Sequence, residues 1–234
     1  MKNINKTITF SYDDGVTQDI RLIEILNKYN LKATFNLNSG LFGCEKTLQV
    51  AGKTVDHKRI KEVDIKSVYQ GHEIAAHTLT HPLLTGLSDE EVIRQVEEDR
   101  LNLSSLCGYE VVGMAYPCGG ENFDDRIVDL IKNKTGIKYA RTLIEDDSFG
   151  YGENLLKLTS TCHQYKRWEK LFDIANRFFE LKNDKPAVLY IWGHSYEFDA
   201  FPNRWEEFEE FCKFISGRKD IIYGTNKEIL LNNI

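Results

Sequence analysis

The sequence has no excess of basic residues and no long apolar run, and these two absences exclude two large classes of partner. Its 36 acidic side chains outnumber its 30 basic ones, which gives a net charge of −6. Binding to nucleic acid or to an anionic membrane needs a basic patch, and the sequence shows none. No stretch approaches the roughly 18 apolar residues of a membrane span. We therefore expect neither a nucleic-acid nor a membrane partner.

The sequence also lacks an apolar leader and paired cysteine motifs. Residues 1–6 run straight into a strand-like segment, which predicts a cytoplasmic protein. The five cysteines are scattered with no C-x-x-C pair, which favours free thiols in a reducing compartment. Only Cys118 lies within a motif, and the residues around it suit a metal better than a thiol nucleophile.

The sequence does contain a regular alternation of predicted strands and helices. Its 234 residues, 41% of them hydrophobic, fit a single domain spanning residues 1–234. A strand at 7–10, a helix at 17–29 capped by Thr17 and a strand at 32–37 form a βαβ unit, which needs a parallel sheet. Further strands are predicted at 72–76, 111–115, 138–142, 155–160, 187–192 and 220–223, and further helices at 88–106, 123–133, 167–181 and 205–216. A small hairpin turning at Gly52 is expected to border a cleft.

Polar residues occur where successive predicted strands end. They are Asp13, Asp14, Asn36, Asn38, His77, His81, Tyr116, Arg141, His163 and His194. Barrels of parallel strands and helices place their chemistry at this face. The pattern favours an α/β fold with one closed or partly open (β/α) barrel of seven or eight strands. The alternative is an open, doubly wound sheet.

Two histidines, His77 and His81, lie four residues apart after a short apolar run. They can reach one cation if the backbone between them makes a helix-like turn, because positions i and i+4 share a face. Such a pair alone is weak evidence, since most histidines at this spacing are ordinary surface or partly buried residues. The rest of the sequence has to supply the other groups of a metal site.

Asp13-Asp14-Gly15 supplies two carboxylates at the end of a buried strand. By itself this triplet is typical of a turn. Adjacent residues of an extended chain point in different directions, so one carboxylate can bind a cation while the other stays free as a base. One carboxylate and two imidazoles make the three-ligand set of a catalytic zinc site with an open position.

Four segments together resemble, in order and spacing, the polysaccharide deacetylases of carbohydrate esterase family 4. The segments are Phe10–Gly15, His77–His81, Tyr116–Gly119 and Leu189–His194, and the resemblance spans residues 7 to 198. The resemblance implies a distorted barrel that hydrolyses N-acetyl, or sometimes O-acetyl, groups on sugars.

The resemblance also implies a role for each matching residue. Asp14, His77 and His81 would hold a divalent metal, Asp13 would be the general base and His194 the general acid. A backbone N–H near Cys118, in the segment Tyr116-Pro117-Cys118, would stabilise the oxyanion together with the metal. The ligand types favour Zn²⁺, with Co²⁺ or Ni²⁺ as alternatives.

Two positions depart from the family pattern. An arginine that pairs with the base usually lies two residues before the proline, where this sequence has Ala115, and we predict that Arg141 replaces it. The acidic residue that orients the acid histidine is not evident, and the candidates are Asp146 and Asp147, although a surface loop is the simpler interpretation.

A few other polar and aromatic residues are candidates for the cleft or for structural roles. His163 and Trp192 are candidate cleft residues, and His163 competes with His194 for the role of acid. His57 and His72 are expected to be structural or solvated, and Glu197 and Asp199 to belong to a polar loop.

The resulting hypothesis is a metal-dependent hydrolase that removes acetyl groups from N-acetylated amino sugars. Without an export signal, a small saccharide or a cytoplasmic glycoconjugate is the expected substrate. The alternatives are hydrolysis of a non-sugar amide, such as a ureide or a cyclic imide, on the same fold, and a carbohydrate-binding protein that has lost turnover.

Overall fold

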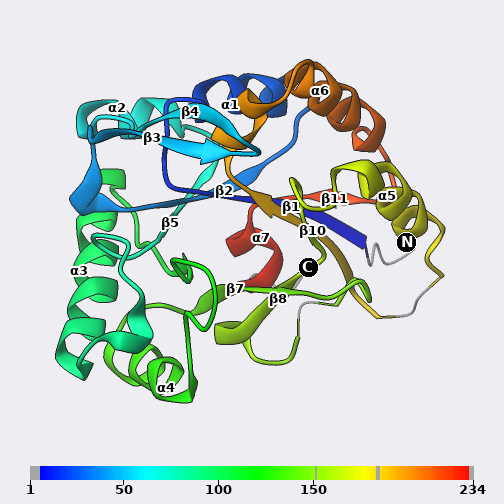
Figure 1. The fold of residues 1–234 in the computed structure, drawn as a ribbon. Helices are drawn as coiled ribbons and strands as arrows, with labels where there is room; N and C mark the ends of the chain where they lie inside the picture. Colours follow the sequence, from blue (N-terminus) through cyan, green and yellow to red (C-terminus); the bar gives the residue numbers. More distant parts are fainter. Residues whose placement is uncertain (1–5, 151, 183–184, 232–234) are drawn as a thin grey trace.

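The chain forms one main parallel sheet with helices around its outside. The computed structural model describes residues 6–150, 152–182 and 185–231. Figure 1 shows helices α1, α3, α4, α5 and α6 around the periphery and α7 across the middle of the strands. The arrangement has the layers expected of a barrel in which each strand packs against an outer helix.

The main sheet contains β1 (Lys6–Asp13), β2 (Ala33–Leu37), β5 (Glu73–Ala76), β6 (Gly113–Ala115), β7 (Tyr139–Glu145), β8 (Leu158–Ser160), β9 (Cys162–His163), β10 (Ala187–Gly193) and β11 (Ile222–Tyr223). A separate antiparallel hairpin contains β3 (Glu45–Val50) and β4 (Lys53–Lys58). The helices are α1 (Asp19–Lys28), α2 (Glu62–Val68), α3 (Asp89–Cys107), α4 (Asp125–Lys134), α5 (Leu171–Glu180), α6 (Arg204–Ile215) and α7 (Asn226–Leu231). Short 3₁₀ turns are η1 (Ser39–Leu41), η2 (Leu84–Gly86), η3 (Leu155–Lys157), η4 (Trp168–Lys170) and η5 (Ser195–Ala200).

The strand order is β8-β7-β6-β5-β2-β1-β10-β9, with β11 added beside β1. The two ends of this order, β8 and β9, are separated in the chain by Thr161 alone. One short segment therefore pairs with β7 through its first half and with β10 through its second half. The predicted distorted barrel is confirmed, although its ends are joined by the chain and not by a ladder between β8 and β9.

The neighbouring strands β1 and β10 are buried on both faces. Every residue of β10 is buried, as is every residue of β1 after Lys6. Such continuous burial is typical of parallel strands covered by side chains inside and by helices outside. The apolar sequence of 187–192 is explained by this position in the sheet.

Helix α7 closes the amino-terminal end of the barrel. Its Asn226 accepts a hydrogen bond from Thr9 at 2.8 Å and donates one to the Tyr190 hydroxyl at 2.6 Å. The N–H of Lys227 donates to the Glu73 carboxylate at 2.8 Å. Because α7 covers this end, a cleft that admits a substrate is expected at the carboxyl ends of the strands.

Most element boundaries agree with the sequence, and the differences have local causes. Ser88 caps α3 by accepting from the Glu91 N–H at 3.3 Å, and Gly108 ends that helix in the left-handed conformation, close to the predicted bounds of 88–106. The predicted cap at Thr17 is wrong, because α1 starts one residue later, after Gln18, without a side-chain cap. The short helices α2 and α7 were not predicted.

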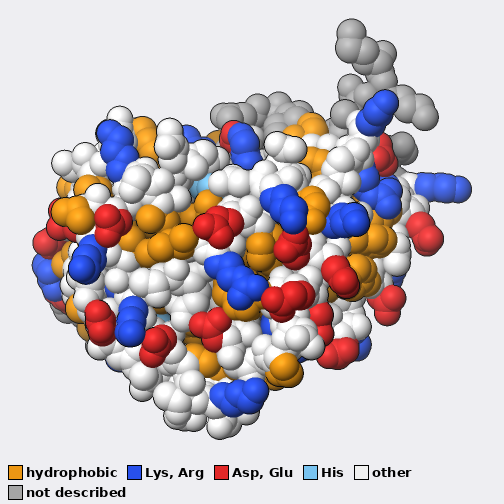
Figure 2. All heavy atoms as spheres, turned by 90° about the horizontal axis from the view of Figure 1, so that it is seen from above, with side chains coloured by type: hydrophobic (Ala, Val, Ile, Leu, Met, Phe, Trp, Pro, Cys, Tyr) orange, Lys and Arg blue, Asp and Glu red, His pale blue; other side chains and the backbone are white. Residues whose placement is uncertain are grey.

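The surface carries both charges in mixed order. Figure 2 shows Lys and Arg side chains interspersed with Asp and Glu over one face, with no area of a single sign. This distribution gives no basic patch on that face. Within residues 6–150, 152–182 and 185–231, no helix combines the length and the apolar character that crossing a bilayer requires.

Candidate active site

A cleft of about 630 Å³ opens at the carboxyl ends of the barrel strands. Because parallel strands all end on this side, residues that follow separate strands meet there. All of the predicted site residues except Pro117 and Arg141 line the cleft: Asp13, Asp14, His77, His81, Tyr116, Cys118, His163, Trp192 and His194. The β3–β4 hairpin also lines it, as the sequence predicted, with Lys46, Leu48 and His57.

Asp13 forms a fully buried ion pair with Arg141. Nη2 of Arg141 lies 2.6 Å from Oδ1 and 2.5 Å from Oδ2 of Asp13, and Asn36 donates to Oδ1 at 2.7 Å. Burial alone would raise the pKa of Asp13, but the charge of Arg141, followed by the nearby His77 and His194, lowers that pKa below its usual value. Asp13 is therefore an ionised, fixed carboxylate at neutral pH, which is the state that a general base needs.

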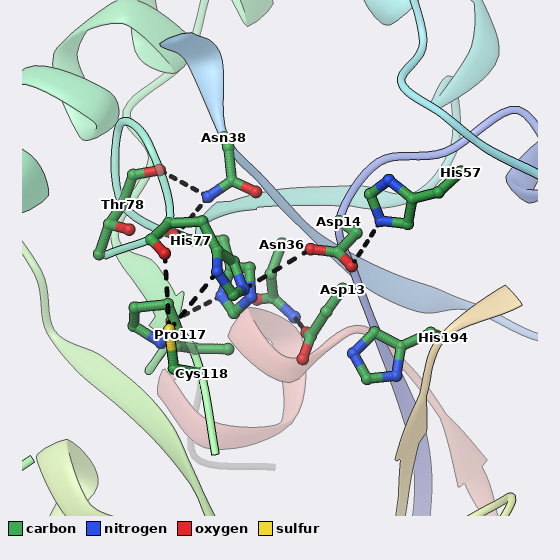
Figure 3. Close-up of polar contacts among 12 residues, drawn as sticks. Asp13, Asp14, Asn36, Asn38, His57, His77, Thr78, Pro117, Cys118 and His194 are labelled. Carbon is green, nitrogen blue, oxygen red and sulfur yellow. Dashed lines mark hydrogen bonds and ion pairs between the residues drawn. The ribbon is translucent and has the colours of Figure 1, made fainter. Parts of the chain in front are cut away.

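Asp14 directly follows β1 and has a left-handed backbone conformation. Its φ angle is 85°, and its N–H donates to the carbonyl of Asn36 at 3.0 Å. The two neighbouring carboxylates consequently face different partners (Figure 3). Burial would raise the pKa of Asp14, but a hydrogen bond from His57 and the charge of Arg59 hold that pKa well below its usual value.

The backbone between His77 and His81 does not form the helix-like turn through which their spacing would allow the two rings to reach one cation. Thr78 and His81 have φ angles of 69° and 59°, and no helix includes this segment. Hydrogen bonds from outside replace those of a helical turn, because the Asn38 amide donates to the carbonyls of His77 at 2.5 Å and Thr78 at 2.7 Å. The two imidazole rings still meet, with centroids 4.8 Å apart.

Asp14, His77 and His81 fit a divalent cation. Their ligand atoms all lie within 4.8 Å of one another. Nδ1 of His77 lies 2.9 Å from the carbonyl of Ala115, so it carries the hydrogen and leaves the lone pair on Nε2. Nδ1 of His81 lies 3.6 Å from the Cys118 sulfur. Burial lowers the pKa of His81 and brings that of His77 to about 4, which keeps both rings neutral, as metal ligands must be.

His194 lies across the cleft and is oriented by Glu197. Its Nδ1 is 3.2 Å from Oε1 of Glu197, and its backbone N–H donates to Oε2 at 3.2 Å. Burial alone would lower the pKa of His194, but the charge of Glu197, followed by those of Asp14 and Asp13, raises it to about 9. His194 is thus protonated at neutral pH, as a general acid must be.

His163 supports Glu197 from the other side. Nδ1 of His163 accepts hydrogen bonds from the backbone N–H groups of Tyr165 at 3.2 Å and Lys166 at 3.4 Å. Its hydrogen is therefore on Nε2, which lies 3.4 Å from Glu197. His163, His194 and Glu197 are close enough to hold a metal, but a protonated Nε2 has no lone pair to offer. Burial lowers the pKa of His163 to about 4, so His194 is the better acid of the two.

Sequence comparison decides the family. The sequence model described as polysaccharide deacetylase matches residues 1–140, which is more than half of the chain. The chain belongs to the polysaccharide deacetylase family. The matched region includes Asp13, Asp14, His77 and His81.

Curated relatives match this chain over part of their length. The peptidoglycan-N-acetylmuramic acid deacetylase PdaC of Bacillus subtilis is 29% identical over 119 residues, which cover 50% of this chain and 22% of PdaC. A chitooligosaccharide deacetylase of Rhizobium leguminosarum is 25% identical over 122 residues, which cover 51% of this chain and 50% of that protein. The matches thus cover at most half of these two relatives.

Solved structures of the family share the fold. The Bacillus subtilis PdaC structure superposes with a TM-score of 0.56 at 17% identity, covering 96% of this chain and 90% of that one. A family 4 carbohydrate esterase from Streptomyces lividans gives a TM-score of 0.57 at 15% identity, covering 94% and 92%. A pseudoenzyme of carbohydrate esterase family 4 from Bacillus anthracis gives 0.57 at 16% identity, covering 97% and 66%.

Arg141 lies opposite Ala115, the position where the family pattern led us to expect an arginine. Ala115 and Arg141 are partners in the β6–β7 ladder, so the guanidinium reaches Asp13 from the next strand. Arg141 is the third residue of β7 and not its last, because the strand continues to Glu145, beyond its predicted end. Its guanidinium carbon lies 4.2 Å from the centre of the Trp192 ring.

The candidates for orienting the acid histidine lie elsewhere in this family member. Asp146 accepts hydrogen bonds within its own loop, from Ser148, and Asp147 lies 3.5 Å from Arg177. Glu197, expected in a polar loop, contacts His194 instead. The sequence could have indicated this contact, because Glu197 lies three residues after His194 and a short turn can bring two such residues together.

The segment Tyr116-Pro117-Cys118 is held by a residue that sequence reasoning missed. The buried Asn122 amide donates to the carbonyls of Tyr116 at 3.3 Å, Pro117 at 3.0 Å and Cys118 at 3.0 Å. Cys118 has a φ of 66°, a left-handed conformation fixed by these contacts. Trp192 packs edge-on against His163, with ring centres 4.2 Å apart, and forms part of the cleft wall.

Of the two expectations for His57, structural or solvated, the solvated one is wrong. The ring is 1% exposed, and its Nε2 lies 3.0 Å from Oδ2 of Asp14. Arg59 likewise contacts Asp14. Sequence reasoning missed both because they reach the site from a hairpin about 45 residues away, with no motif linking the two segments. The interpretation of His72 as structural agrees with its contacts, since its two ring nitrogens lie against Ala33 and Asn27.

Proposed function

We propose that this chain is a metal-dependent deacetylase that removes acetyl groups from N-acetylated amino sugars of a poly- or oligosaccharide or glycoconjugate. One observation carries the proposal. The three-residue ligand set Asp14, His77 and His81 shares a cleft with an ion-paired carboxylate, Asp13, and a protonated imidazole, His194. The peptidoglycan and chitooligosaccharide deacetylases among the relatives support this substrate class. We also propose that residues 1–234 form one catalytic domain.

A divalent cation held by Asp14, His77 and His81 would act as a Lewis acid on the acetyl carbonyl and lower the pKa of a water molecule. The donor set favours Zn²⁺, and Co²⁺ or Ni²⁺ would also accept it. The nitrogen atoms that His77 and His81 present are fixed by the contacts of their other ring nitrogens.

Asp13 is the proposed general base. Its carboxylate takes the proton of the attacking water, and Arg141 and Asn36 keep it oriented toward the cleft. The lowered pKa of Asp13 ensures that the carboxylate is free to accept. A backbone N–H of the segment Tyr116-Pro117-Cys118 is the proposed partner of the developing oxyanion.

His194 is the proposed general acid. Because its Nδ1 hydrogen is directed to Glu197, the Nε2 hydrogen is available for the leaving amine. Loss of this proton to the amine completes cleavage of the amide bond. Trp192 and His163 form the wall behind the acid and contribute to the shape of the substrate site.

The direct test is acetate release. The chelator-treated protein is incubated with a panel of N-acetylated saccharides, with and without added Zn²⁺, Co²⁺ or Ni²⁺. The proposal requires metal-dependent release of acetate from at least one saccharide. Sugar binding without release under any metal would instead favour a carbohydrate-binding protein, and release of ammonia or a ring-opened acid would favour a non-sugar amide.

The proposed base is tested by Asp13→Asn. This variant is expected to keep its bound metal and to lose about 10²- to 10⁴-fold in kcat, because an amide cannot accept the proton. Metal content is measured by elemental analysis beside the acetate assay. Asp125→Asn, at an exposed helix start, is the control and should retain full activity. Loss of metal in Asp13→Asn would show that the roles of Asp13 and Asp14 are exchanged or shared.

A further inference from the structure

The β3–β4 hairpin is bound to the turn that carries Asp14. The N–H of Ile60 donates to the carbonyl of Gly15 at 2.9 Å, and the N–H of Thr17 donates to the carbonyl of Lys58 at 2.8 Å. These bonds connect the end of the hairpin to the residues directly after Asp14. The position of the hairpin and the position of the Asp14 carboxylate are therefore coupled.

An apolar face anchors the hairpin on the other side of the cleft. Val55 packs with Tyr196 and Ala200 of η5, and Leu48 and Val50 pack against the same cluster. This segment directly follows His194. The hairpin thus contacts both the turn after Asp14 and the segment after His194, and its own His57 is buried.

Both oxygens of Asp14 are engaged by the hairpin. Nε2 of His57 lies 3.0 Å from Oδ2, and Nη2 of Arg59 lies 3.0 Å from Oδ1. Since an ionised carboxylate only accepts hydrogen bonds, Nε2 of His57 must carry the hydrogen. Oδ1 also lies 3.8 Å from Nε2 of His81, and its second lone pair remains for a cation.

The contacts of His57 differ from those of a histidine that only stabilises the fold. His72 uses both ring nitrogens, one on Ala33 and one on Asn27. In His57 one nitrogen is committed to Asp14, and the buried Nδ1 has no hydrogen-bond partner among the described residues. A buried nitrogen without a partner lowers the stability of the fold. The contact with Asp14 is therefore the main contribution of the His57 ring.

We propose that His57 is a positioning residue of the metal site, through which the β3–β4 hairpin sets the affinity for the cation. By holding Oδ2, His57 presents Oδ1 of Asp14 to the cation beside His77 and His81. Outer-shell partners of this kind typically change metal affinity by about 10- to 100-fold. This inference rests on the proposed metal site but not on the identity of the substrate.

The test compares variants at position 57 for metal affinity. Zn²⁺ and Co²⁺ are titrated into the chelator-treated full chain in competition with a chromophoric chelator, and the Co²⁺ absorption spectrum reports the ligand geometry. His57→Phe keeps the ring volume and removes the donor, so it should bind about 10- to 100-fold more weakly. His57→Gln places an amide N–H near the position of Nε2 and should stay within about threefold of wild type.

His57→Asn provides a second variant in case the phenylalanine does not fold. Its shorter amide cannot reach Oδ2, so it should weaken binding as His57→Phe does. Thr54→Ala, on the exposed part of the same hairpin and without contact to Asp14, is the control and should bind like wild type. Arg59 is unsuitable for this test because it also contacts the Asp14 carbonyl and Asn38.

The inference is overturned if His57→Asn, or a folded His57→Phe, binds both metals with wild-type affinity and an unchanged Co²⁺ spectrum. Acetate release by the same preparations separates this result from a failure of the proposed function. If the variants bind metal more weakly but the wild-type protein releases no acetate, the deacetylase assignment alone is refuted. Acetate release by wild type with unaltered affinity in the variants would refute the role of His57 alone.

Discussion

At the scale of single residues, the buried pair of Asp13 and Arg141 matters for the free energy of unfolding. Both side chains are almost completely buried, at 2% and 0% exposure. A buried ion pair adds little net stability, but removing one partner leaves an uncompensated charge in a low-dielectric environment. Arg141 therefore matters for folding as well as for the base.

Arg141→Met is expected to lower the free energy of unfolding by about 3–5 kcal/mol, since Asp13 would keep only its contact with Asn36. Denaturant titration measures the loss. Arg177→Met removes an arginine of similar size from an exposed pair and should cost less than about 1 kcal/mol. Equal effects of the two substitutions would contradict the importance of the buried pair.

Glu197→Gln is expected to change the pH dependence of catalysis. The acid works only while His194 is protonated, so activity falls as pH rises through the His194 pKa, which is about 9. Removing the Glu197 charge lowers that pKa, so the alkaline limb of kcat/KM should move down by about one unit or more. A bound cation would lower the His194 pKa in both wild type and Glu197→Gln. The alkaline limb of the variant should therefore still lie below that of wild type.

The matched control for this pH profile is Glu206→Gln, which lies on the exposed face of α6 in a pair with Arg21. It should leave the alkaline limb unchanged. A uniform loss of activity in Glu197→Gln, with no movement of the limb, would mean that Glu197 only supports the local structure.

At the scale of elements, helix α3 holds the turn between the metal-binding histidines. Asp99 accepts the N–H of His77 at 3.0 Å and the N–H of Ser39 at 2.7 Å, one on each carboxylate oxygen. Gln95 accepts the N–H of Leu79 at 2.8 Å. The left-handed residues of the turn are tolerated because α3 supplies these acceptors.

Asp99→Asn should destabilise the protein by about 1–3 kcal/mol, because the new amide group faces a backbone N–H. The measurement belongs at pH 8, since burial raises the pKa of Asp99 to about 7 and both oxygens accept above that pH. The variant should also bind the cation more weakly, because Asp99 holds the backbone of His77. The control is Glu98→Gln at the exposed neighbouring position, which should change the free energy of unfolding by no more than about 0.5 kcal/mol. A similar loss of stability in Asp99→Asn and Glu98→Gln would contradict this role of Asp99.

Local signals explain which elements the sequence predicted correctly. Ser88 and Gly108 determine the ends of α3 through contacts with neighbouring residues, and the apolar run at 187–192 follows from burial on both faces. The turn after β5 could not be predicted, since its conformation depends on acceptors and donors from β2 and α3. Likewise, nothing in the local sequence of the β3–β4 hairpin indicates that His57 reaches Asp14.

At the scale of the whole molecule, metal binding should stabilise one cooperative unit. The ligands come from the ends of β1 and β5, which are parts of the same sheet, so the cation would bind only the folded chain. If residues 1–234 form one domain, thermal unfolding should show a single transition. A ligand at 100 times its Kd adds about 2.7 kcal/mol to the free energy of unfolding.

For a chain of this length, that gain corresponds to a rise in Tm of about 5–10 °C. Differential scanning calorimetry of the chelator-treated protein, with and without Zn²⁺, measures it. His77→Ala should fold and show no metal-dependent shift. Two separate transitions, only one of them shifted by metal, would contradict the single domain, and an equal shift in His77→Ala would contradict the ligand assignment.

The ladder partnership of Ala115 and Arg141 also has an evolutionary consequence. Two guanidinium groups cannot share the buried space beside Asp13, so an arginine at one position excludes an arginine at the other. A lineage passing from one arrangement to the other must cross an intermediate with either two buried arginines or none. Both intermediates are expected to be less stable, because each leaves a buried charge without a partner. The two sites are therefore expected to change together across the family, and an arginine introduced at 115 should be tolerated only after Arg141 is replaced.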